Sequence, residues 1–375
     1  MSSPNNTSLK IGVYGIRTIP STYSGYETFC NVLLPELVQR GHAVTLFTRE
    51  SGRQEYEGVK KIGLPSINTK QFDTLSHSVV CAFVSRMKRF DVVLTFNVAN
   101  AISLAMLRFT GTPTVLNVDG QEWKRGKWGK LARSVFYNSG KISKYTGTRL
   151  ITDCNEMGRI YKEEFNAITD VIPYCWTGLL TERELDKPNP KYLSQYDLTA
   201  DQFLVTGGRL VPENNIAEIV ESHVNSDEEM PIAVLGKANY DSPVQRKLDS
   251  LASSDSRVRL LGHISDRRGF GLLLRDSFAY LHGHSVGGIN PSVVEAMGVG
   301  AFVCAFDTPF NREALGDAGT FFANPSTAVR ELCDIVQTTN RDRKRLRGRE
   351  LTAENYSLDK IVSLYEESLQ RAVLR

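Results

Sequence analysis

Apolar runs of strand length alternate with segments of helical spacing along the chain. One set of runs covers 9–15, 43–48, 91–97, 114–118, 149–153 and 170–173, and a second covers 203–207, 231–236, 258–262, 278–283 and 302–306. This alternation is typical of parallel sheets whose strands are joined by right-handed helical crossovers. The pattern therefore predicts an α/β chain with two doubly wound, Rossmann-like halves.

A polar segment separates the two sets of runs. Residues 181–200 contain two prolines, which is typical of a linker or of an irregular entry into the second half. The chain has 375 residues with 41% hydrophobic content, more than one core usually holds. We therefore expect one domain over 1–178, a second over 179–356, and a final helix within 357–375, where the apolar spacing is again helical.

Charge and cysteine content narrow the class of protein. The formal charge of +3 is too small to favour a nucleic-acid partner. The six cysteines form no CxxC motif and no metal-like spacing with the six histidines, so we expect reduced thiols in a cytoplasmic protein and no metal site. No apolar run approaches the roughly 20 residues of a membrane span. Any membrane contact would then be peripheral, at the inner face of the membrane.

Glycines and charged residues follow the predicted strands, and open parallel sheets bind ligands beyond the carboxyl ends of their strands. In the second half these ends carry Gly208, Arg209, Lys237 and His284. Basic groups beside glycine turns suit phosphate oxygens. In the first half Asp119 follows the run 114–118. Turn residues are common after any strand, so a single such position is equally compatible with a purely structural role.

The segment HGHSVGGINPSVVEAMGVG, residues 282–300, combines a glycine turn with the start of a helix. Asn290 is a good N-cap, Pro291 suits the first helical position, and the helix continues from Ser292. A capped helix after a glycine turn is also a common structural element. The segment by itself therefore allows either a ligand site or a simple turn.

The chemistry of this segment favours a ligand. Backbone amides over 287–292, including those of Gly287 and Gly288, would attract an anion at the positive helix end. Glu295 lies about one turn further, where its oxygens could accept hydrogen bonds from sugar hydroxyls. The residues around Glu295 are apolar and small, and a carboxylate among them needs a partner. A diphosphate at the amides and a ribose at Glu295 would describe a sugar nucleotide.

The sequence lacks the motifs of two other ligand sites, the dinucleotide site of an oxidoreductase and the phosphate-binding Walker A loop. Gly12 and Gly15 in IGVYGIRTIP do not form GxGxxG, and no acidic ribose-binding residue follows at the expected distance. A Walker A loop is absent as well. The sequence also has no DxD pair, which removes the usual support for a metal-carried sugar nucleotide.

One segment of the first half is basic and aromatic. Residues 123–152 contain no Asp or Glu. They carry instead Lys124, Arg125, Lys127, Lys130, Arg133, Lys141, Lys144 and Arg149 among Trp123, Trp128, Phe136, Tyr137 and Tyr145. This composition suits an anionic membrane surface or a lipid-diphosphate acceptor, with the contact through 123–149. A solvated basic helix face explains the same pattern.

Longer runs match one family. In chain order they are GIRTIPSTYSGYETF, NVDGQEWKRGKWG, IPYCW, GGRLVPENN, LGHI, HGHSVGGINPSVVEAM and DTPFNREALGDAG. With these runs the chain resembles the GT-B glycosyltransferases of glycosyltransferase family 4, most closely their rhamnosyltransferase-like branch. The resemblance covers most of the chain and implies two Rossmann-like domains facing across a cleft.

The resemblance implies a retaining, metal-independent hexosyltransferase. The second domain would hold a nucleotide-sugar donor, dTDP-L-rhamnose or a UDP-sugar, and the first domain would hold a polysaccharide or lipid-linked saccharide acceptor. No cofactor beyond this co-substrate is implied. The final helix would cross back to the first domain.

The resemblance also implies roles for single residues. Glu295 is similar to the family glutamate that contacts the donor ribose, and Arg209 to the arginine that neutralises the diphosphate. Gly25, beside Ser24, resembles the N-terminal glycine loop that closes over the donor phosphates. Gly208 and the 287–292 segment complete the expected donor site.

Two positions in the expected donor site depart from the family pattern. Gly287 stands where the broader family has a first glutamate, so the contact to the donor sugar would come from Asn290 or His284. Asn214 replaces a frequent lysine, which leaves Lys237 as a second cation for the diphosphate.

Asp119 stands where the family frequently has a histidine. We expect it to orient or deprotonate the acceptor, and with Arg209 and Glu295 it completes the expected catalytic set. The missing first glutamate keeps a second hypothesis open, a noncatalytic sugar-nucleotide-binding or assembly subunit with the same fold. Turnover of a sugar nucleotide distinguishes the two.

Overall fold

The computed structural model describes residues 8–21, 25–50, 52–67, 73–126, 128–238 and 242–374. Packing divides the chain into two compact units. Unit 1 comprises 1–124, 128–174 and 358–375, and unit 2 comprises 125–127 and 175–357. Of the two alternatives for the region 181–200, the entry into the second half is found, because its short helices belong to unit 2.

Unit 1 is built on an eight-stranded sheet with the order β3-β4-β2-β1-β5-β6-β7-β8, in which only β3 and β4 pair antiparallel. Its strands are β1 (Lys10–Tyr14), β2 (Ala43–Thr48), β3 (Arg53–Tyr56), β4 (Val59–Gly63), β5 (Val92–Phe96), β6 (Thr114–Asn117), β7 (Arg149–Thr152) and β8 (Asp170–Val171). The six runs predicted in this half are confirmed as strands. The sequence pattern missed β3 and β4 because RQEY and VKKIG are short and polar.

Central strands of unit 1 are buried on both faces. Ile11 of β1 pairs in parallel register with Val44 of β2 on one side and Val92 of β5 on the other, and all three side chains are buried. Parallel strands covered on both faces need such continuous apolar runs, which is why the runs were visible in the sequence.

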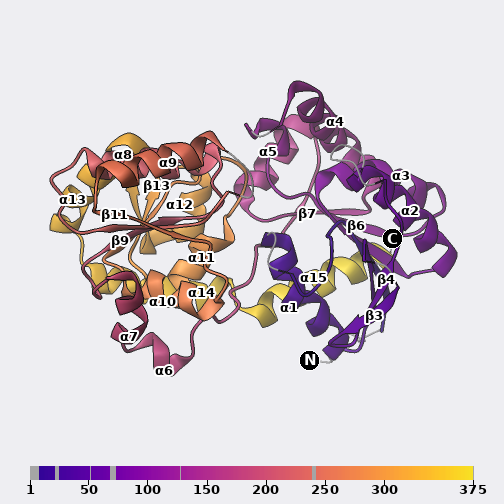
Figure 1. The fold of residues 1–375 in the computed structure, drawn as a ribbon. Coiled ribbons are helices and arrows are strands. Elements are labelled where there is room, and N and C mark those ends of the chain that lie inside the picture. The colour runs from indigo at the N-terminus through magenta and orange to yellow at the C-terminus, as the bar shows by residue number, and fades with distance from the viewer. Residues whose placement is uncertain are drawn as a thin grey trace. The chain divides into compact units, whose positions relative to one another are not determined.

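Helices cover both faces of the unit 1 sheet (Figure 1). On one face α2 (Asp73–Lys88), α3 (Ala101–Phe109) and α4 (Lys130–Thr146) lie side by side, and α1 (Gly25–Gln39) packs with α15 (Leu358–Val373) on the other. The remaining helical elements are α5 (Asn155–Phe165), η1 (Val98–Asn100) and η2 (Glu122–Lys124). The side-chain amide of Asn117 on β6 donates to the Tyr365 hydroxyl at 2.6 Å, which fastens α15 to the sheet.

Unit 2 is built on a six-stranded parallel sheet with the order β11-β10-β9-β12-β13-β14. Its strands are β9 (Leu204–Gly207), β10 (Ile232–Leu235), β11 (Val258–Gly262), β12 (Ala279–His282), β13 (Val303–Phe306) and β14 (Thr320–Phe322). The five runs predicted in this half are confirmed, and β14 was too short to predict. Strand order reverses between β9 and β12, which is the switch point of a doubly wound sheet.

Helices also cover both faces of the unit 2 sheet (Figure 1). One face carries α8 (Ile216–Val224), α9 (Pro243–Ser254) and α13 (Ala328–Thr338), and the other carries α10 (Arg267–Asp276), α11 (Pro291–Gly298) and α14 (Arg341–Asn355). The shorter elements are α6 (Glu182–Leu185), α7 (Pro190–Leu193), α12 (Pro309–Leu315), η3 (Ser194–Tyr196), η4 (Pro212–Asn214), η5 (Gly316–Ala318) and η6 (Pro325–Thr327). Crossover helices on both faces leave only the ends of the strands open to a ligand.

The six cysteines are free thiols. Among the described residues, none of the helices combines the length and apolarity that crossing a bilayer requires.

Candidate functional site

Polar side chains follow three adjacent strands of the unit 2 sheet. Lys237 comes after β10, Arg209 after β9 and His284 after β12, and these strands are neighbours in the sheet. Because neighbouring strands lie about 4.8 Å apart, their loops start within reach of one ligand. Two of the loops flank the switch point, where an open parallel sheet leaves a crevice beyond the carboxyl ends of its strands.

Hydrogen bonds join the loop after β9 to the loop after β12. The Ser285 amide and hydroxyl both donate to the Glu213 carbonyl at 2.9 Å, and the Asn215 amide side chain donates to the Gly283 carbonyl at 2.7 Å. Gly283 permits this approach, since a Cβ at this position would overlap the carbonyl oxygen of Asn214. The two loops therefore form one fixed wall at the switch point.

Asn214 shapes this wall through its side chain. Its Nδ2 donates to the Arg209 carbonyl at 2.8 Å, and its Oδ1 lies 2.9 Å from Nδ1 of buried His284. The Arg209 side chain is exposed, and no carboxylate among the described residues forms an ion pair with it. Asn214 thus holds the loop, and Arg209 is left as the cation that can bind an anion.

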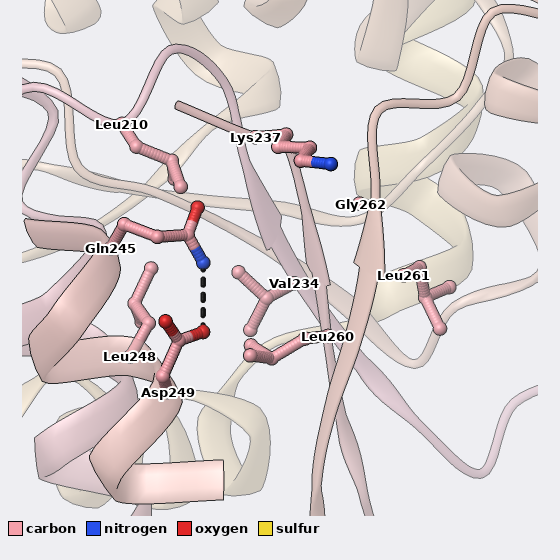
Figure 2. Close-up of a pocket in the computed structure, with 10 residues that line it drawn as sticks. Leu210, Val234, Lys237, Gln245, Leu248, Asp249, Leu260, Leu261 and Gly262 are labelled. Carbon is pink, nitrogen blue, oxygen red and sulfur yellow. Dashed lines mark hydrogen bonds between the residues drawn. The ribbon is translucent and has the colours of Figure 1, made fainter. Parts of the chain in front are cut away.

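Lys237 stands at the rim of a pocket of about 250 Å³ between α9 and strands β10 and β11 (Figure 2). In Figure 2, Gln245 and Asp249 of α9 line one side, joined by a hydrogen bond of 2.9 Å, and Val234 and Leu260 of the strands line the other. The lysine is exposed. Because the floor is apolar, the pocket could hold an uncharged part of a ligand whose anionic part meets Lys237.

The helix start predicted in the 282–300 segment is confirmed. Asn290 is the N-cap of α11 and accepts from the Ser292 amide at 3.1 Å, and Pro291 occupies the first turn. This bond corrects one expectation, because the cap takes the Ser292 amide that was expected to be free for an anion. The Val293 amide is also taken, by the Asn290 carbonyl at 3.0 Å.

The glycine pair before this cap forms the turn that a ligand can approach. Gly287 has φ 92° and Gly288 has φ 80°, conformations that a glutamate would adopt only with strain. Among the described residues, no backbone acceptor takes their amides. The departure from the family pattern at Gly287 is therefore part of a different turn. The backbone amides of Gly287 and Gly288 are left for an anion.

Glu295 is buried and paired with Arg267 of α10. The Arg267 guanidinium donates to Glu295 Oε1. Burial raises the pKa of Glu295, and the charge of Arg267 opposes that rise. The partner that a carboxylate among apolar residues needs is thus a protein side chain, which sequence reasoning missed. Arg267 is itself partly exposed, so the pair is accessible to a ligand from the arginine side.

Two histidines lie buried beneath the glycine turn. Burial lowers the pKa of His282 to about 4, and burial with the nearby His282 lowers the pKa of His284 well below its usual value. Both rings are therefore neutral near pH 7. His282 Nδ1 lies 3.0 Å from the Tyr280 hydroxyl, which is 3.2 Å from Ser292 Oγ. His284, proposed from the sequence as a sugar contact, already bonds to Asn214. The described part of the chain holds no group of three metal-ligating residues.

Asp119 belongs to unit 1 and follows β6. It has φ 61° and is half-buried, and its backbone amide donates to the Asn117 side chain at 3.1 Å. Burial, and second to it the charge of Asp119, raises the pKa of Tyr161 and Tyr174 well above the usual value. The carboxylate therefore lies close to two neutral phenols at the carboxyl edge of the unit 1 sheet.

Gly25 is the first residue of α1, and Ser24 lies outside the described residues. The segment before α1 is fastened to this helix by Glu27, whose carboxylate accepts from the Ser21 hydroxyl at 2.6 Å and from the Arg17 amide at 3.0 Å. Sequence reasoning missed this role. An acidic residue in the first turn of a helix that follows a glycine-containing loop was the available signal.

The basic, aromatic segment 123–149 divides into a buried and an exposed part. Trp123 is buried against Phe165, with ring centroids 5.1 Å apart. Leu131 and Tyr145 of α4 are exposed. Trp123 therefore serves the core of unit 1, and α4 carries the exposed part.

Two Rossmann-like units, each built on a doubly wound sheet, are typical of the GT-B fold class. Residues 23–173 match the family model described as Glycosyltransferase Family 4. A search of curated protein sequences gives no match to the chain.

Solved structures extend the likeness over the whole chain. Sucrose-phosphate synthase from Thermosynechococcus elongatus is 17% identical with a TM-score of 0.80, and the match covers 98% of this chain and 99% of that one. HepE of Anabaena in complex with UDP-glucose is 13% identical with a TM-score of 0.75, covering 97% and 100%. The UDP-forming α,α-trehalose-phosphate synthase from Burkholderia vietnamiensis is 9% identical with a TM-score of 0.76, covering 97% and 99%. The chain thus has the GT-B fold, with Glycosyltransferase Family 4 features over 23–173.

Proposed function

We propose that the protein is a retaining, metal-independent glycosyltransferase. It transfers a hexose, with L-rhamnose favoured by the sequence resemblance, from dTDP-L-rhamnose or a UDP-sugar to a polysaccharide or lipid-linked saccharide. The donor binds the domain over 179–356 and the acceptor the domain over 1–178. The enzyme works in the cytoplasm with a peripheral membrane contact that includes 123–149. The Family 4 match and the UDP-glucose complex of HepE, which shares the fold, support this proposal.

The observation that carries the proposal is the exposed Arg209 at the switch point of unit 2. One hydrogen bond from Asn214 Nδ2 to the Arg209 carbonyl holds its backbone, and no described carboxylate pairs with its guanidinium. A fixed backbone with an uncompensated cation is suited to a diphosphate, which guanidinium groups bind in a bidentate manner. Lys237 and the Gly287–Gly288 amides are the further groups at the same sheet edge that would bind it.

Transfer breaks the bond between the sugar C1 and the β-phosphate oxygen, and it forms a bond between C1 and an acceptor hydroxyl. Negative charge develops on the departing diphosphate, and preorganised cations and amides stabilise it. The acceptor proton passes to the departing phosphate on the same face of the sugar, which retains the configuration. Asp119 orients the acceptor hydroxyl for this proton transfer; in the alternative route, Asp119 takes the proton in place of the phosphate.

Glu295 would act together with Arg267 at the donor. Since Arg267 binds Oε1, the second carboxylate oxygen is the one that would accept from a ribose hydroxyl. The arginine would meet the ligand beside it. Both side chains come from helices of unit 2, α10 and α11, which hold them rigidly.

Donor binding and turnover test the proposal. The full chain is titrated with dTDP-L-rhamnose, UDP-glucose and UDP, and the rise in melting temperature identifies the donor. Release of the nucleoside diphosphate is then measured with saccharide acceptors. Removal of one preorganised charge-stabilising group typically costs about 100-fold or more in rate, so we expect Arg209→Gln to lower kcat/KM by that factor. Glu295→Gln should weaken donor binding about tenfold.

Arg343→Gln is the matched control. Arg343 is exposed on α14 and has no ion-pair partner among the described residues, so its loss removes the same charge from the unit without touching the switch point. Donor-induced stabilisation without turnover by any acceptor would favour the noncatalytic sugar-nucleotide-binding subunit. Equal activity of the Arg209→Gln and Arg343→Gln variants would contradict the assigned site.

A further inference from the structure

Unit 1 exposes apolar side chains on three neighbouring helices. α2, α3 and α4 lie side by side on one face of the sheet (Figure 1), and we call their outer surface the α2–α3–α4 face. Its exposed apolar residues are Val79, Phe83, Met87, Ile102, Met106, Phe109, Leu131 and Tyr145. The exposed fraction is 59% for Phe83, 68% for Met87 and 91% for Phe109, so these side chains are open to water.

α2 exposes larger apolar side chains than those it fully buries. Val79, Phe83 and Met87 are four residues apart and share one stripe, which faces outward. The side chains that α2 fully buries are small or polar, namely His77, Ser78, Cys81, Ala82 and Ser85. A helix that only covers a sheet turns its apolar stripe inward, because burial of apolar surface stabilises the fold. The outward stripe therefore serves something other than the core of unit 1.

α4 shows the same arrangement. Its buried positions are small or polar, whereas Leu131 at its start is 82% exposed and Tyr145 near its end is 67% exposed. The buried positions are Ser139, Gly140, Ser143 and Thr146. α2 and α4 both contact α3, which lies between them and exposes Ile102, Met106 and Phe109. The three helices therefore make a contiguous apolar surface, and such patches mark interaction sites.

Charge identifies the kind of partner. After Asp73, none of the three helices contains an acidic residue. Their basic residues are Arg86, Lys88, Arg108, Lys130, Arg133, Lys141 and Lys144. Lys144 lies over the ring of exposed Tyr145, with the ammonium 4.9 Å from the ring centroid. A second copy docked face to face would bring like charges together, which is unfavourable. An anionic partner with an apolar interior fits both properties of the surface.

We propose that the α2–α3–α4 face docks on an anionic lipid bilayer. Phe83, Met87 and Phe109 enter the headgroup region, and the lysines and arginines beside them bind lipid phosphates. This inference rests on the membrane contact included in the proposed function. It extends that contact from 123–149 to α2 and α3, where the sequence patterns gave no indication of a surface. Docking through unit 1 would present this unit to a lipid-linked acceptor.

Vesicle binding by the full chain tests the inference. Flotation is compared between vesicles of phosphatidylcholine alone and vesicles that also contain phosphatidylglycerol, at low and at high salt. We expect binding to the anionic vesicles only, reduced by salt because part of the attraction is electrostatic. The double variant Phe83→Gln with Phe109→Gln should lower the partition coefficient about tenfold or more, since two large apolar side chains no longer insert.

Control variants distinguish this surface from apolar and basic side chains that are exposed elsewhere in unit 1. Ile168→Gln removes an apolar side chain that is 90% exposed elsewhere in unit 1, and it should bind vesicles like the wild type. Lys141→Gln with Lys144→Gln should weaken binding to anionic vesicles, whereas Lys162→Gln on α5 should not. All variants are first shown to keep the melting temperature of the wild type.

Three outcomes overturn the inference: no binding to anionic vesicles, binding unchanged in the Phe83→Gln and Phe109→Gln variant, or a concentration-dependent dimer that this variant abolishes. The last result would assign the face to a second copy of the chain. Donor-induced thermal stabilisation is measured on the same variants. A variant that loses vesicle binding but is still stabilised by the donor shows that the membrane surface is separate from the donor site. If the donor does not stabilise the wild type, the proposed function is refuted instead.

Discussion

His223 gives unit 2 a pH-dependent stability that can be worked out from the structure. It lies in the last turn of α8 and is fully buried, and neither ring nitrogen has a hydrogen-bond partner among the described residues. Burial lowers its pKa to about 4 from an ordinary 6.5, and the charge of Arg257 lowers it further, opposed by Asp255 and Glu228. The folded state therefore requires the neutral ring.

The direction of the change in stability with pH follows from proton binding. Because the pKa of His223 is lower in the folded than in the unfolded chain, the unfolded chain binds more protons between pH 6.5 and 4. The stabilisation is fully present above pH 6.5 and is lost as the pH falls through about 4. The difference in pKa corresponds to about 3 kcal/mol in total, of which about 2 kcal/mol is lost by pH 5.

The assay is urea unfolding at pH 8 and at pH 5, for the wild type and for the variants His223→Leu and His223→Gln. Both variants remove the titrating group, and they differ in polarity. At pH 8 we expect His223→Leu to be as stable as the wild type or more so, since it removes two buried nitrogens without partners. His223→Gln keeps a buried polar group and should be less stable.

The decisive quantity is the loss of unfolding free energy between pH 8 and pH 5. It should be about 2 kcal/mol larger in the wild type than in either variant. If the wild type and both variants lose the same free energy, the burial of a neutral His223 does not control the acid stability of unit 2, and the reasoning is refuted.

Two further substitutions test the packing at the two sheet edges. Gly283→Ala places a methyl group against the Asn214 carbonyl and should lower the unfolding free energy by about 1–3 kcal/mol. Gly129→Ala is the control, because the new Cβ has open space around it, and it should change the unfolding free energy by less than about 0.5 kcal/mol. Equal effects of the two variants in urea unfolding would contradict the close approach of the two loops. Asn117→Ala removes the side-chain amide that donates to the buried Tyr365 hydroxyl and should lower the unfolding free energy by about 1–3 kcal/mol. A double-mutant cycle with Tyr365→Phe should give a coupling free energy of at least about 0.5 kcal/mol. Additive effects of the two substitutions would show that this hydrogen bond does not hold α15.

Local patterns in the sequence were sufficient for the architecture. The predicted strands are found because each is a continuous apolar run, which a parallel strand buried on both faces requires. The N-cap at Asn290 and the proline after it were readable because capping depends on residues next to each other in the chain. Strands β3, β4 and β14 were missed because short or polar strands carry no such run.

Contacts between distant segments could not be read in the same way. Glu295 needed a partner, but the choice of Arg267, 28 residues earlier, follows only from the packing of α10 against α11. Likewise, the bond between Asn214 and His284 joins residues 70 apart. The sequence marked these side chains as candidates. Only the fold shows that His284 and the Ser292 amide are already bonded, and that Arg209 is exposed with no carboxylate paired to it among the described residues.

The sequence by itself determined where the apolar strands form, and therefore that the chain folds into two doubly wound units, because the burial requirements of such strands are met by consecutive residues. Tertiary structure decided which way each helix faces. Spacing by four places Val79, Phe83 and Met87 on one stripe of α2 in any environment. Whether that stripe meets the sheet or the solvent depends on which neighbours cover the helix, and those neighbours come from other parts of the chain.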